Sequence, residues 1–360
     1  MPTGVTFRRT RDVLTRAIAA HVTPAAAIEV GAAHGPAWSE AFGTLTYDAD
    51  SPAASPDTIF DLASLTKVLA TTALVMRHVE CGSMALDDTV ASHLPAWSAP
   101  DRADVRLADL LAHASGLPAH ALLFTSCTGG AAFEDAICRS ALAYPPRSAS
   151  LYSDLGFILL GRLLERWAPL DRQFETLTTQ MGPIQDLQFL PPDLWLRRTA
   201  PTRVDPWRQR LLVGEVDDDN AYALGGVAAH AGLFGTTRAV GDCARHLLQV
   251  LDDRRGVIRR DTVERFTTRW EAVADSSRAL GWDTMRPSSS CGTRMSSRAF
   301  GHTGFTGTSL WIDPVRNLYV VLLTNRVHPR PDGDTITALR RAVHDAVAED
   351  LERGGAPPGD

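Results

Sequence analysis

Ser64 and Lys67 are two side chains whose spacing could produce an activated nucleophile. Lys67 is the only lysine among the 36 Lys and Arg residues of this 360-residue chain. Either residue type can serve as a surface cation, but only an ammonium can lose its proton at reachable cost when it is desolvated. Ser64 lies three positions earlier, so on a helix its hydroxyl shares a face with the amine. A serine beside a deprotonatable lysine is a candidate nucleophile for covalent catalysis.

The residues that follow Lys67 predict that the pair is buried. Most positions from 68 to 76 are apolar and surround the helix on nearly every side, which is the pattern of a buried helix. The Ser-x-x-Lys spacing alone is weak, because it also occurs by chance. The unique lysine and its apolar setting make a catalytic role the stronger interpretation.

Two further triplets make the hypothesis specific. Tyr152-Ser153-Asp154 lies in the middle of the chain, and His302-Thr303-Gly304 precedes a C-terminal hairpin pattern. The order and spacing of the three motifs resembles the serine β-lactamase and penicillin-binding protein superfamily, in particular its class C-like branch, which also holds esterases and D-amino-acid peptidases. The segments 110–118 and 301–307 resemble the same group. The resemblance covers roughly residues 20–350.

The resemblance implies a role for each residue of the motifs. Ser64 would form the acyl-enzyme, and Lys67 and Tyr152 would share the general-base and general-acid work, with the ammonium favouring the phenolate of Tyr152. The backbone N–H groups of Ser64 and Phe305 would form the oxyanion hole. The residues expected to line the substrate cleft are Asp154, His302, Thr303 and Gly304.

Two departures from the family pattern bear on the substrate. His302 stands where many members have lysine, and a histidine near neutral pH is only partly charged, so we expect weak, pH-dependent capture of a carboxylate. Asp154 replaces a common asparagine, and it either faces the cleft as an anion or only caps a helix. His113, Ser115 and His230 are interpreted as structural supports of the cleft.

The hydrophobic pattern predicts the elements that must position these residues. Helices are expected over 5–21, from Ser64, over 105–114, 131–143, 155–167, 239–251 and 335–351, and strands over 26–31, 37–43, 309–313 and 317–325. The expected fold class is α+β: an antiparallel sheet, flanked by helices, with an inserted mostly helical domain. Residues 1–85 and 216–360 would form the sheet domain, and residues 86–215 the insertion, where no convincing strand alternation is visible.

Composition excludes several classes of function. The net charge is −6 without a strongly basic stretch, which disfavours nucleic acid as a partner. Five scattered cysteines without C-x-x-C spacing argue against a disulfide framework and a zinc site, and no metal or cofactor is expected. No apolar run reaches the roughly 20 residues of a membrane span, and no signal peptide is visible, so the expected location is cytoplasmic.

The sequence therefore predicts a serine hydrolase acting through an acyl-enzyme on Ser64. The expected substrate is a small ester, an amide or a D-amino-acid compound. A β-lactamase or D,D-carboxypeptidase acting on penicillin or peptidoglycan-type substrates is the alternative. A non-catalytic acyl-binding sensor is disfavoured by the intact motif residues, and a metallohydrolase by the lack of an H-x-x-x-H pair.

Overall fold

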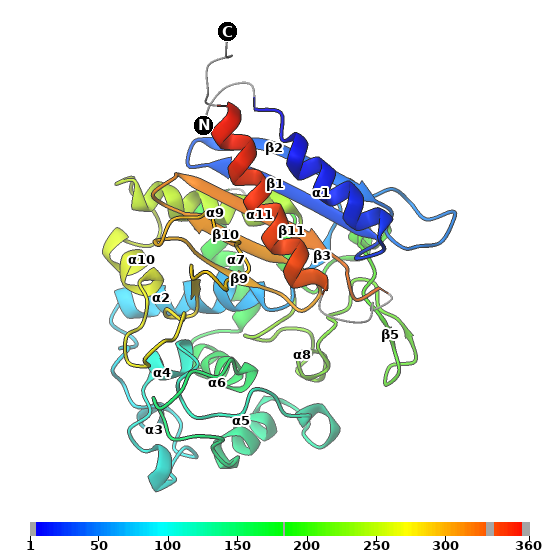
Figure 1. Ribbon diagram of the computed structural model, residues 1–360. Helices are drawn as coiled ribbons and strands as arrows, with labels where there is room; N and C mark the ends of the chain where they lie inside the picture. Colours follow the sequence, from blue (N-terminus) through cyan, green and yellow to red (C-terminus); the bar gives the residue numbers. More distant parts are fainter. Residues whose placement is uncertain (1–4, 183, 329–334, 355–360) are drawn as a thin grey trace.

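The two ends of the chain form one six-stranded antiparallel sheet (Figure 1). The computed structural model describes residues 5–182, 184–328 and 335–354. The strand order is β2-β1-β11-β10-β9-β8, so the N-terminal hairpin lies beside the C-terminal strands. The strands are β1 (Ala25–Ala32), β2 (Gly35–Gly43), β8 (Asp283–Thr284), β9 (Phe300–Thr303), β10 (Ser309–Asp313) and β11 (Leu318–Thr324).

Helices cover both faces of this sheet because its central strands are apolar on both faces. In β1, Ala26 and Ile28 pack in a cluster with α1 (Arg8–Ala19) and α11 (Thr335–Gly354), whereas Ala25 and Ala27 belong to the core on the opposite side. In the register of the pair, Ala26 lies opposite Thr324 and Val30 opposite Val320. Helix α9 (Thr237–Leu251) packs on the other face, against β1, β10 and β11. The sheet is thus the middle of three layers (Figure 1).

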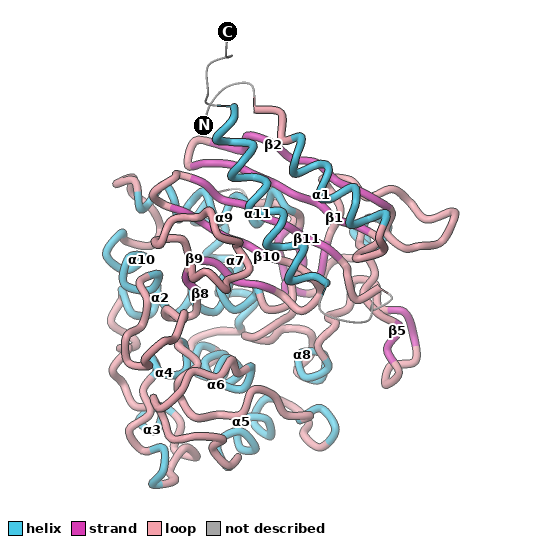
Figure 2. The backbone as a smooth tube through the Cα atoms, viewed as in Figure 1, coloured by secondary structure: helices cyan, strands magenta, loops and turns pink. Residues whose placement is uncertain are grey.

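The middle of the chain contains helices joined by long loops, and α3 to α6 lie below the sheet in the orientation of Figure 2. The helices between β2 and β8, besides α9, are α2 (Ala73–Glu80), α3 (Val90–His93), α4 (Leu107–Leu111), α5 (Gly130–Arg139), α6 (Asp154–Leu164), α7 (Leu170–Met181), α8 (Asp219–Ala223) and α10 (Arg260–Thr267). A π-helix, Lys67–Thr72, leads directly into α2, and 3₁₀-helices lie at Pro100–Arg102, Leu123–Thr125 and Asp193–Arg198.

Two small sheets connect the helical part to the main sheet. One has the order β3-β7-β4, with β3 (Phe60–Asp61), β7 (Leu233–Gly235) and β4 (Leu187–Phe189). The other is a hairpin of β5 (Val204–Asp205) and β6 (Arg210–Leu211). Strand β3 ends immediately before the turn that carries Ser64, so the first small sheet fixes that turn relative to the molecule.

The expected fold class is confirmed, and β1, β2, β10 and β11 begin and end within two residues of the predicted strands, whereas β3, β7 and β8 and the short helices α3 and α8 were not predicted. Three short strands, β4, β5 and β6, fall inside the range 86–215 where no strand was expected, because two or three residues are too few to show alternation. Helices α7 and α10 were not predicted. The boundaries of the two proposed domains stay a prediction.

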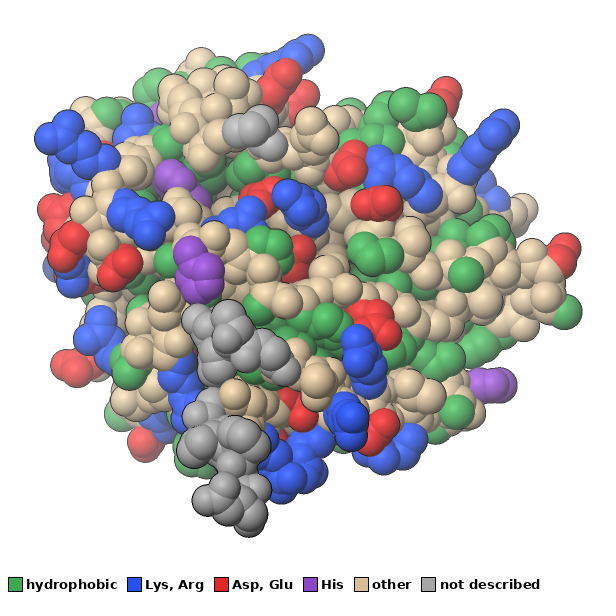
Figure 3. All heavy atoms as spheres, turned by 90° about the horizontal axis from the view of Figure 1, so that it is seen from above, with side chains coloured by type: hydrophobic (Ala, Val, Ile, Leu, Met, Phe, Trp, Pro, Cys, Tyr) green, Lys and Arg blue, Asp and Glu red, His purple; other side chains and the backbone are tan. Residues whose placement is uncertain are grey.

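Charged side chains of both signs alternate on the face over α1 and α11 (Figure 3). Arg9 of α1 pairs with Glu349 of α11 at 3.5 Å, and Arg294 reaches Glu349 and Glu352, both at 3.1 Å. The Arg9–Glu349 pair joins the two terminal helices, which lie side by side on one face of the sheet, and the Arg294 pairs join α11 to the loop before β9. Among the described residues, no helix combines the length and the apolar character that crossing a membrane requires.

Candidate active site

The side chains of Ser64, Lys67 and Tyr152 meet at one point. Lys67 Nζ lies 3.0 Å from Ser64 Oγ, and the Tyr152 hydroxyl donates a hydrogen bond to the same oxygen at 2.7 Å. Ser64 belongs to the turn after β3, Lys67 begins the π-helix, and Tyr152 precedes α6. The three residues predicted as catalytic are therefore in direct contact, in the arrangement that an activated nucleophile requires.

A buried carboxyl group shapes the turn that presents Ser64. Ala63 has φ = +47°, a left-handed conformation that is uncommon for a residue with a side chain. Asp61 holds it there, because Oδ1 accepts the N–H of Ala63 at 2.8 Å and Oδ2 accepts the N–H of Asp217 at 2.7 Å. Burial, and then the charge of Asp217, raise the pKa of Asp61 to about 7. The sequence analysis missed this residue, although an acidic residue between Phe60 and Leu62 is a visible signal.

Lys67 is fully buried and its three N–H donors all have acceptors. Besides Ser64 Oγ, Nζ contacts the carbonyl oxygen of His230 at 2.9 Å and Asp154 Oδ1 at 2.7 Å. Burial alone lowers the pKa of Lys67, but the Asp154 carboxylate, together with the other interactions with Asp154 and Tyr152, outweighs it and raises the pKa above its ordinary value. Lys67 is thus an ammonium in the resting protein, which corrects the expectation that desolvation makes it readily lose its proton.

Tyr152 is a neutral phenol in the same state. Its ring packs against His113 with centroids 4.7 Å apart, and Lys67 Nζ lies 5.0 Å from its centroid. Burial raises the pKa of Tyr152 by more than the nearby ammonium lowers it. Lys67 therefore favours the phenolate as expected, but desolvation of the phenolate outweighs this effect in the resting protein.

Asp154 pairs with Lys67 and also lines the cleft. It is the first residue of α6, and its side chain is 17% exposed. Burial would raise the pKa of this carboxyl, but the Lys67 ammonium and His120 hold it well below its usual range. His120 Nδ1 lies 3.7 Å from Asp154 Oδ2. Two roles were predicted for Asp154, and the structure favours the first: the side chain faces the cleft as an anion, and it is paired with Lys67.

His302 supplies no positive charge to the cleft, which corrects the expectation of a partly charged group. It lies on β9, is 2% exposed, and its Nδ1 is 2.9 Å from the carbonyl oxygen of Thr303. Burial, and then the charges of Arg278 and Lys67, hold the pKa of His302 well below its ordinary value. A neutral ring beside Tyr152, with centroids 5.8 Å apart, therefore replaces the lysine of the family pattern.

The end of β9 packs closely on the Ser64 turn. Gly304 has no room for a side chain, because a Cβ would lie 2.1 Å from Thr308 Oγ1 and 2.7 Å from the carbonyl oxygen of Leu62. Thr308 donates to that carbonyl at 3.0 Å. Thr303, Gly304 and Phe305 all line the cleft with Ser64. The positions of Ser64 and Phe305 fit the predicted oxyanion hole, which stays a prediction.

The histidines interpreted as supports do lie beneath the catalytic residues. His113 is buried, and its Nδ1 accepts the N–H of Ser153 at 3.0 Å, which fixes the backbone next to Tyr152. Ser115 is also buried and lies two residues after His113 in the chain. His230 is held by Asp218, 2.8 Å from its Nε2, and its own carbonyl accepts from Lys67.

An arginine that the sequence analysis missed lies in the cleft. The cleft has a volume of about 790 Å³, and Ser64, Tyr152, His302 and Arg278 all line it. The Arg278 guanidinium lies 5.4 Å from the centroid of the Tyr152 ring. No carboxylate of the described part of the chain pairs with it. Arg278 comes from the loop before β8, so no motif or spacing in the sequence connects it to Ser64.

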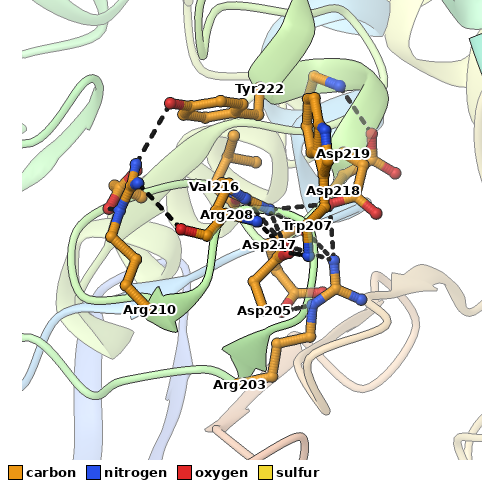
Figure 4. A network of polar contacts seen from close by, with 12 residues as sticks. Arg203, Asp205, Trp207, Arg208, Arg210, Val216, Asp217, Asp218, Asp219 and Tyr222 are labelled. Atoms are coloured by element: carbon orange, nitrogen blue, oxygen red, sulfur yellow. Dashed lines mark hydrogen bonds and ion pairs between the residues drawn. The ribbon is translucent and has the colours of Figure 1, made fainter. Parts of the chain in front are cut away.

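Arg203, Asp217, Asp218 and Asp219 also line the cleft, and they belong to a network of arginines and aspartates that continues behind it (Figure 4). Arg203 reaches Asp219 at 2.8 Å and Asp217 at 3.5 Å, and Arg208 reaches Asp205 and Asp219 at 2.8 and 2.9 Å. Asp205, Asp217 and Asp219 thus each have a guanidinium partner, whereas Asp218 is paired with His230. The network fixes the loop between β6 and α8, whose Asp217 N–H is bound by Asp61.

Known proteins with the same sequence pattern and fold identify the family. The family described as Beta-lactamase matches residues 11–345. A protein of Escherichia coli K12 named "Putative D-alanyl-D-alanine carboxypeptidase" is 32% identical over 317 residues, covering 76% of this chain and 70% of its own. The chain therefore belongs to the beta-lactamase family, and it is a serine hydrolase of that family.

Solved structures of low sequence identity share the fold. A class C β-lactamase from Rhodobacter sphaeroides superposes with a TM-score of 0.73 at 18% identity, covering 95% of this chain and 99% of its own. The octameric penicillin-binding protein homologue from Pyrococcus abyssi gives a TM-score of 0.74 at 18% identity, with 96% of this chain and 77% of its own covered. The predicted resemblance to the β-lactamase and penicillin-binding protein superfamily is thus confirmed by the family match, and these structures show that the fold is shared.

Proposed function

We propose that the protein hydrolyses amide bonds to a terminal D-amino acid, with Ser64 as the acylated nucleophile and the free carboxylate of the leaving amino acid bound by Arg278. The observation that carries the substrate class is the guanidinium of Arg278 in the cleft, over the ring of Tyr152. A guanidinium recognises a carboxylate through charge-assisted, often bidentate hydrogen bonds. The name of the Escherichia coli relative, a carboxypeptidase, supports the same substrate class.

The chemistry follows from the contacts of Ser64. Its Oγ attacks the scissile carbonyl, and the backbone N–H groups of Ser64 and Phe305 stabilise the oxyanion, a contribution on the order of 3 kcal/mol for each donor. The Tyr152 phenol, hydrogen-bonded to Ser64 Oγ, protonates the departing amine. Water then attacks the acyl-enzyme, with the same groups acting in reverse.

The proposed carboxylate site differs from the one expected from the sequence. The sequence predicts weak capture because His302 replaces lysine, and a neutral His302 would make that capture weaker still. Arg278 supplies the missing charge from a different segment, at the same end of the cleft as His302, whose pKa it depresses. Binding of a carboxylate is then independent of pH over the range in which arginine stays charged.

The test compares an N-acyl-D-alanyl-D-alanine peptide with its C-terminal carboxamide, which has the same scissile bond without the carboxylate. We expect the wild-type protein to prefer the peptide with the free carboxylate. Arg278→Gln should reduce kcat/KM for this peptide by about 10- to 100-fold more than for the carboxamide, because only the carboxylate loses a hydrogen bond to a charged group. Arg172→Gln is the matched control, since Arg172 is an exposed residue of α7 that does not line the cleft. Equal effects of Arg278→Gln on both peptides would contradict the proposal.

A second candidate is hydrolysis of small neutral esters, which the uncharged His302 favours. Turnover of p-nitrophenyl butyrate with a higher kcat/KM than that of the D-alanyl-D-alanine peptide would make this the better description. Intact-protein mass spectrometry after exposure to a fluorophosphonate, the ester and a penicillin identifies the acylated residue. An adduct on a residue other than Ser64 would remove the nucleophile assignment.

A further inference from the structure

The resting contacts around Ser64 leave no group ready to accept its proton. An ammonium has three N–H donors and no acceptor site. The three donors of Lys67 are matched by Ser64 Oγ, the His230 carbonyl and Asp154 Oδ1, at 3.0, 2.9 and 2.7 Å. The Tyr152 phenol also donates to Ser64 Oγ, so it too holds its proton. Acylation therefore requires that Lys67 lose a proton. Lys67 can lose it before Ser64 transfers its hydroxyl proton, or at the same time as that transfer.

We propose that Asp154 is the group that takes this proton, so that Ser64, Lys67 and Asp154 act as a relay. As the bond from Ser64 Oγ to the acyl carbon forms, the hydroxyl proton passes to Lys67 Nζ, and Nζ gives one of its protons to Asp154 Oδ1. The electron pair of the carbonyl bond moves to the oxyanion. The relay rests on the proposed acylation of Ser64 and adds a third member to it.

The protons balance when the intermediate collapses. The bond from the acyl carbon to the leaving group breaks as the oxyanion re-forms the carbonyl, and the leaving group receives the Tyr152 proton. Tyr152 is reprotonated by Lys67, and Lys67 recovers a proton from Asp154. The resting arrangement of ammonium, carboxylate and phenol is then restored beside the acyl-enzyme. No external acid or base is consumed.

Burial of the pair reduces the cost of this transfer, although the resting pair is an ammonium and a carboxylate. Moving a proton from an ammonium to a contacting carboxylate turns two charges into two neutral groups, which a desolvated site favours relative to water. Lys67 is fully buried, and only 17% of the Asp154 side chain is exposed. An asparagine, which many family members have at this position, could accept a hydrogen bond from Lys67 but not its proton.

The backbone holds Asp154 in place for this role. Its N–H donates to the carbonyl of Ala119 at 3.1 Å, and Ser153 Oγ donates to the carbonyl of Pro118 at 2.6 Å. This anchors the segment that carries His120, whose ring is half exposed and lies 3.7 Å from Asp154 Oδ2. The charged groups that face His120 are Asp154 of α6 and the acidic residues Asp218 and Asp219 at the start of α8.

The opposing interpretation is that Asp154 only keeps Lys67 protonated. The two differ in what Asp154→Asn does to the acylation rate. Loss of the anion lowers the proton affinity of Lys67 in both cases, so the comparison uses the plateau of the pH–rate profile, where the rate no longer changes with pH. Under the relay, the plateau rate falls, by about 10²-fold or more, because a proton acceptor has been removed. Under the opposing interpretation the plateau is unchanged or higher.

The experiment measures the acylation burst of p-nitrophenyl acetate from pH 5 to 10 for the wild-type protein, Asp154→Asn and the control Asp135→Asn, which changes a half-exposed carboxylate of α5 that pairs with Arg139 and does not line the cleft. A plateau lowered at least 100-fold in Asp154→Asn, with a near-normal plateau in Asp135→Asn, is the expected result. An unchanged or raised plateau in Asp154→Asn overturns the relay. Absence of any burst in the wild-type protein would instead overturn the proposed function, on which the relay depends.

A proton inventory measures the burst rate of the wild-type protein in mixtures of H₂O and D₂O. It tests the relay without any substitution, so it can be carried out even if Asp154→Asn does not fold. Two protons in flight give a rate that falls along a curve with increasing deuterium fraction. A straight line, which a single transferred proton produces, would contradict the proposal.

Discussion

Arg340 of the C-terminal helix donates hydrogen bonds to the carbonyl oxygens of Gly304 and Thr308, at 2.6 and 2.8 Å. Helix α11 thus holds the end of β9, beside Ser64, from the far side of the sheet. Both bonds come from a buried guanidinium, and hydrogen bonds to charged groups contribute about 1.5–3 kcal/mol each. Arg340 therefore acts as a positioning residue for the cleft.

We predict that Arg340→Met lowers the free energy of unfolding by about 2–4 kcal/mol, because two buried carbonyl oxygens lose a charged donor. We also expect kcat to fall more than KM rises, since the displaced strand end carries the predicted oxyanion donor. Denaturant unfolding and steady-state kinetics measure the two effects. A destabilised variant with unchanged kcat at a temperature where it is folded would limit Arg340 to a structural role.

Lys67→Arg tests whether the proton of this residue, rather than its charge, is required. The substitution keeps the positive charge but gives a group that cannot release a proton, and a larger one in a fully buried space. We predict a loss of kcat/KM of about 10²–10⁴-fold, close to that of Lys67→Ala. The hydrolysis of p-nitrophenyl acetate by both variants measures it. A Lys67→Arg protein with near wild-type activity would refute the inference drawn from the unique lysine.

The sequence identifies residues that stand out through a local pattern, such as a motif spacing or an apolar run. Ser64 and Lys67 stand out by spacing and by the absence of any other lysine, and the strands at 309–313 and 318–324 by their apolar runs. The state of these groups could not be predicted. The protonation of Lys67 and Tyr152 depends on Asp154, which comes from a distant segment, and on the depth of burial.

Arg278 and Asp61 illustrate the same limit. Thirty-five residues of this chain are arginines, so Arg278 has no distinguishing feature in the sequence. Only the packing of the loop before β8 places it over Tyr152. Asp61 acts through hydrogen bonds to Ala63 and to Asp217, and the latter is more than 150 positions away.

Gly304 is predicted to be intolerant of any side chain. In Gly304→Ala the new Cβ would overlap Thr308 Oγ1 and the backbone carbonyl of Leu62, which cannot move without disturbing the Ser64 turn. We expect a loss of about 1–3 kcal/mol in the free energy of unfolding, typical of overpacking, together with reduced kcat.

Gly156→Ala provides the control for this prediction. Gly156 lies inside α6, and an added Cβ there would meet its nearest neighbours at ordinary contact distances of 3.5–3.8 Å. The change should be neutral, or stabilise the helix by up to about 1 kcal/mol. Thermal unfolding of both variants measures the difference, and a Gly304→Ala protein as stable as Gly156→Ala would show that the strand end can shift.

The buried carboxyl of Asp61 predicts a pH dependence of stability with a definite sign. Its pKa is about 7 in the folded protein, compared with an ordinary value of 3.8. Between these values the folded state binds the extra proton, so the contribution of Asp61 to stability is fully present below pH 3.8 and is lost as the pH rises toward 7. The slope of this contribution is at most about 1.4 kcal/mol per pH unit.

Asp61→Asn removes that titration. Because other groups contribute their own slopes, the quantity to measure is the difference in free energy of unfolding between the variant and the wild-type protein at pH 4, 5.5, 7 and 8. At pH 4 the carboxyl group of Asp61 is protonated and uncharged in the folded wild-type protein, so we expect the variant to be the less stable of the two. As the pH rises to 7 the wild-type protein loses this stability, and the free energy of unfolding of the variant should increase relative to that of the wild-type protein. Above pH 8 the difference should become constant, since Asp61 is then ionised in both the folded and the unfolded states. A difference that is constant from pH 4 to 8 would mean that Asp61 keeps an ordinary pKa, and that the Ser64 turn is held by a carboxylate throughout.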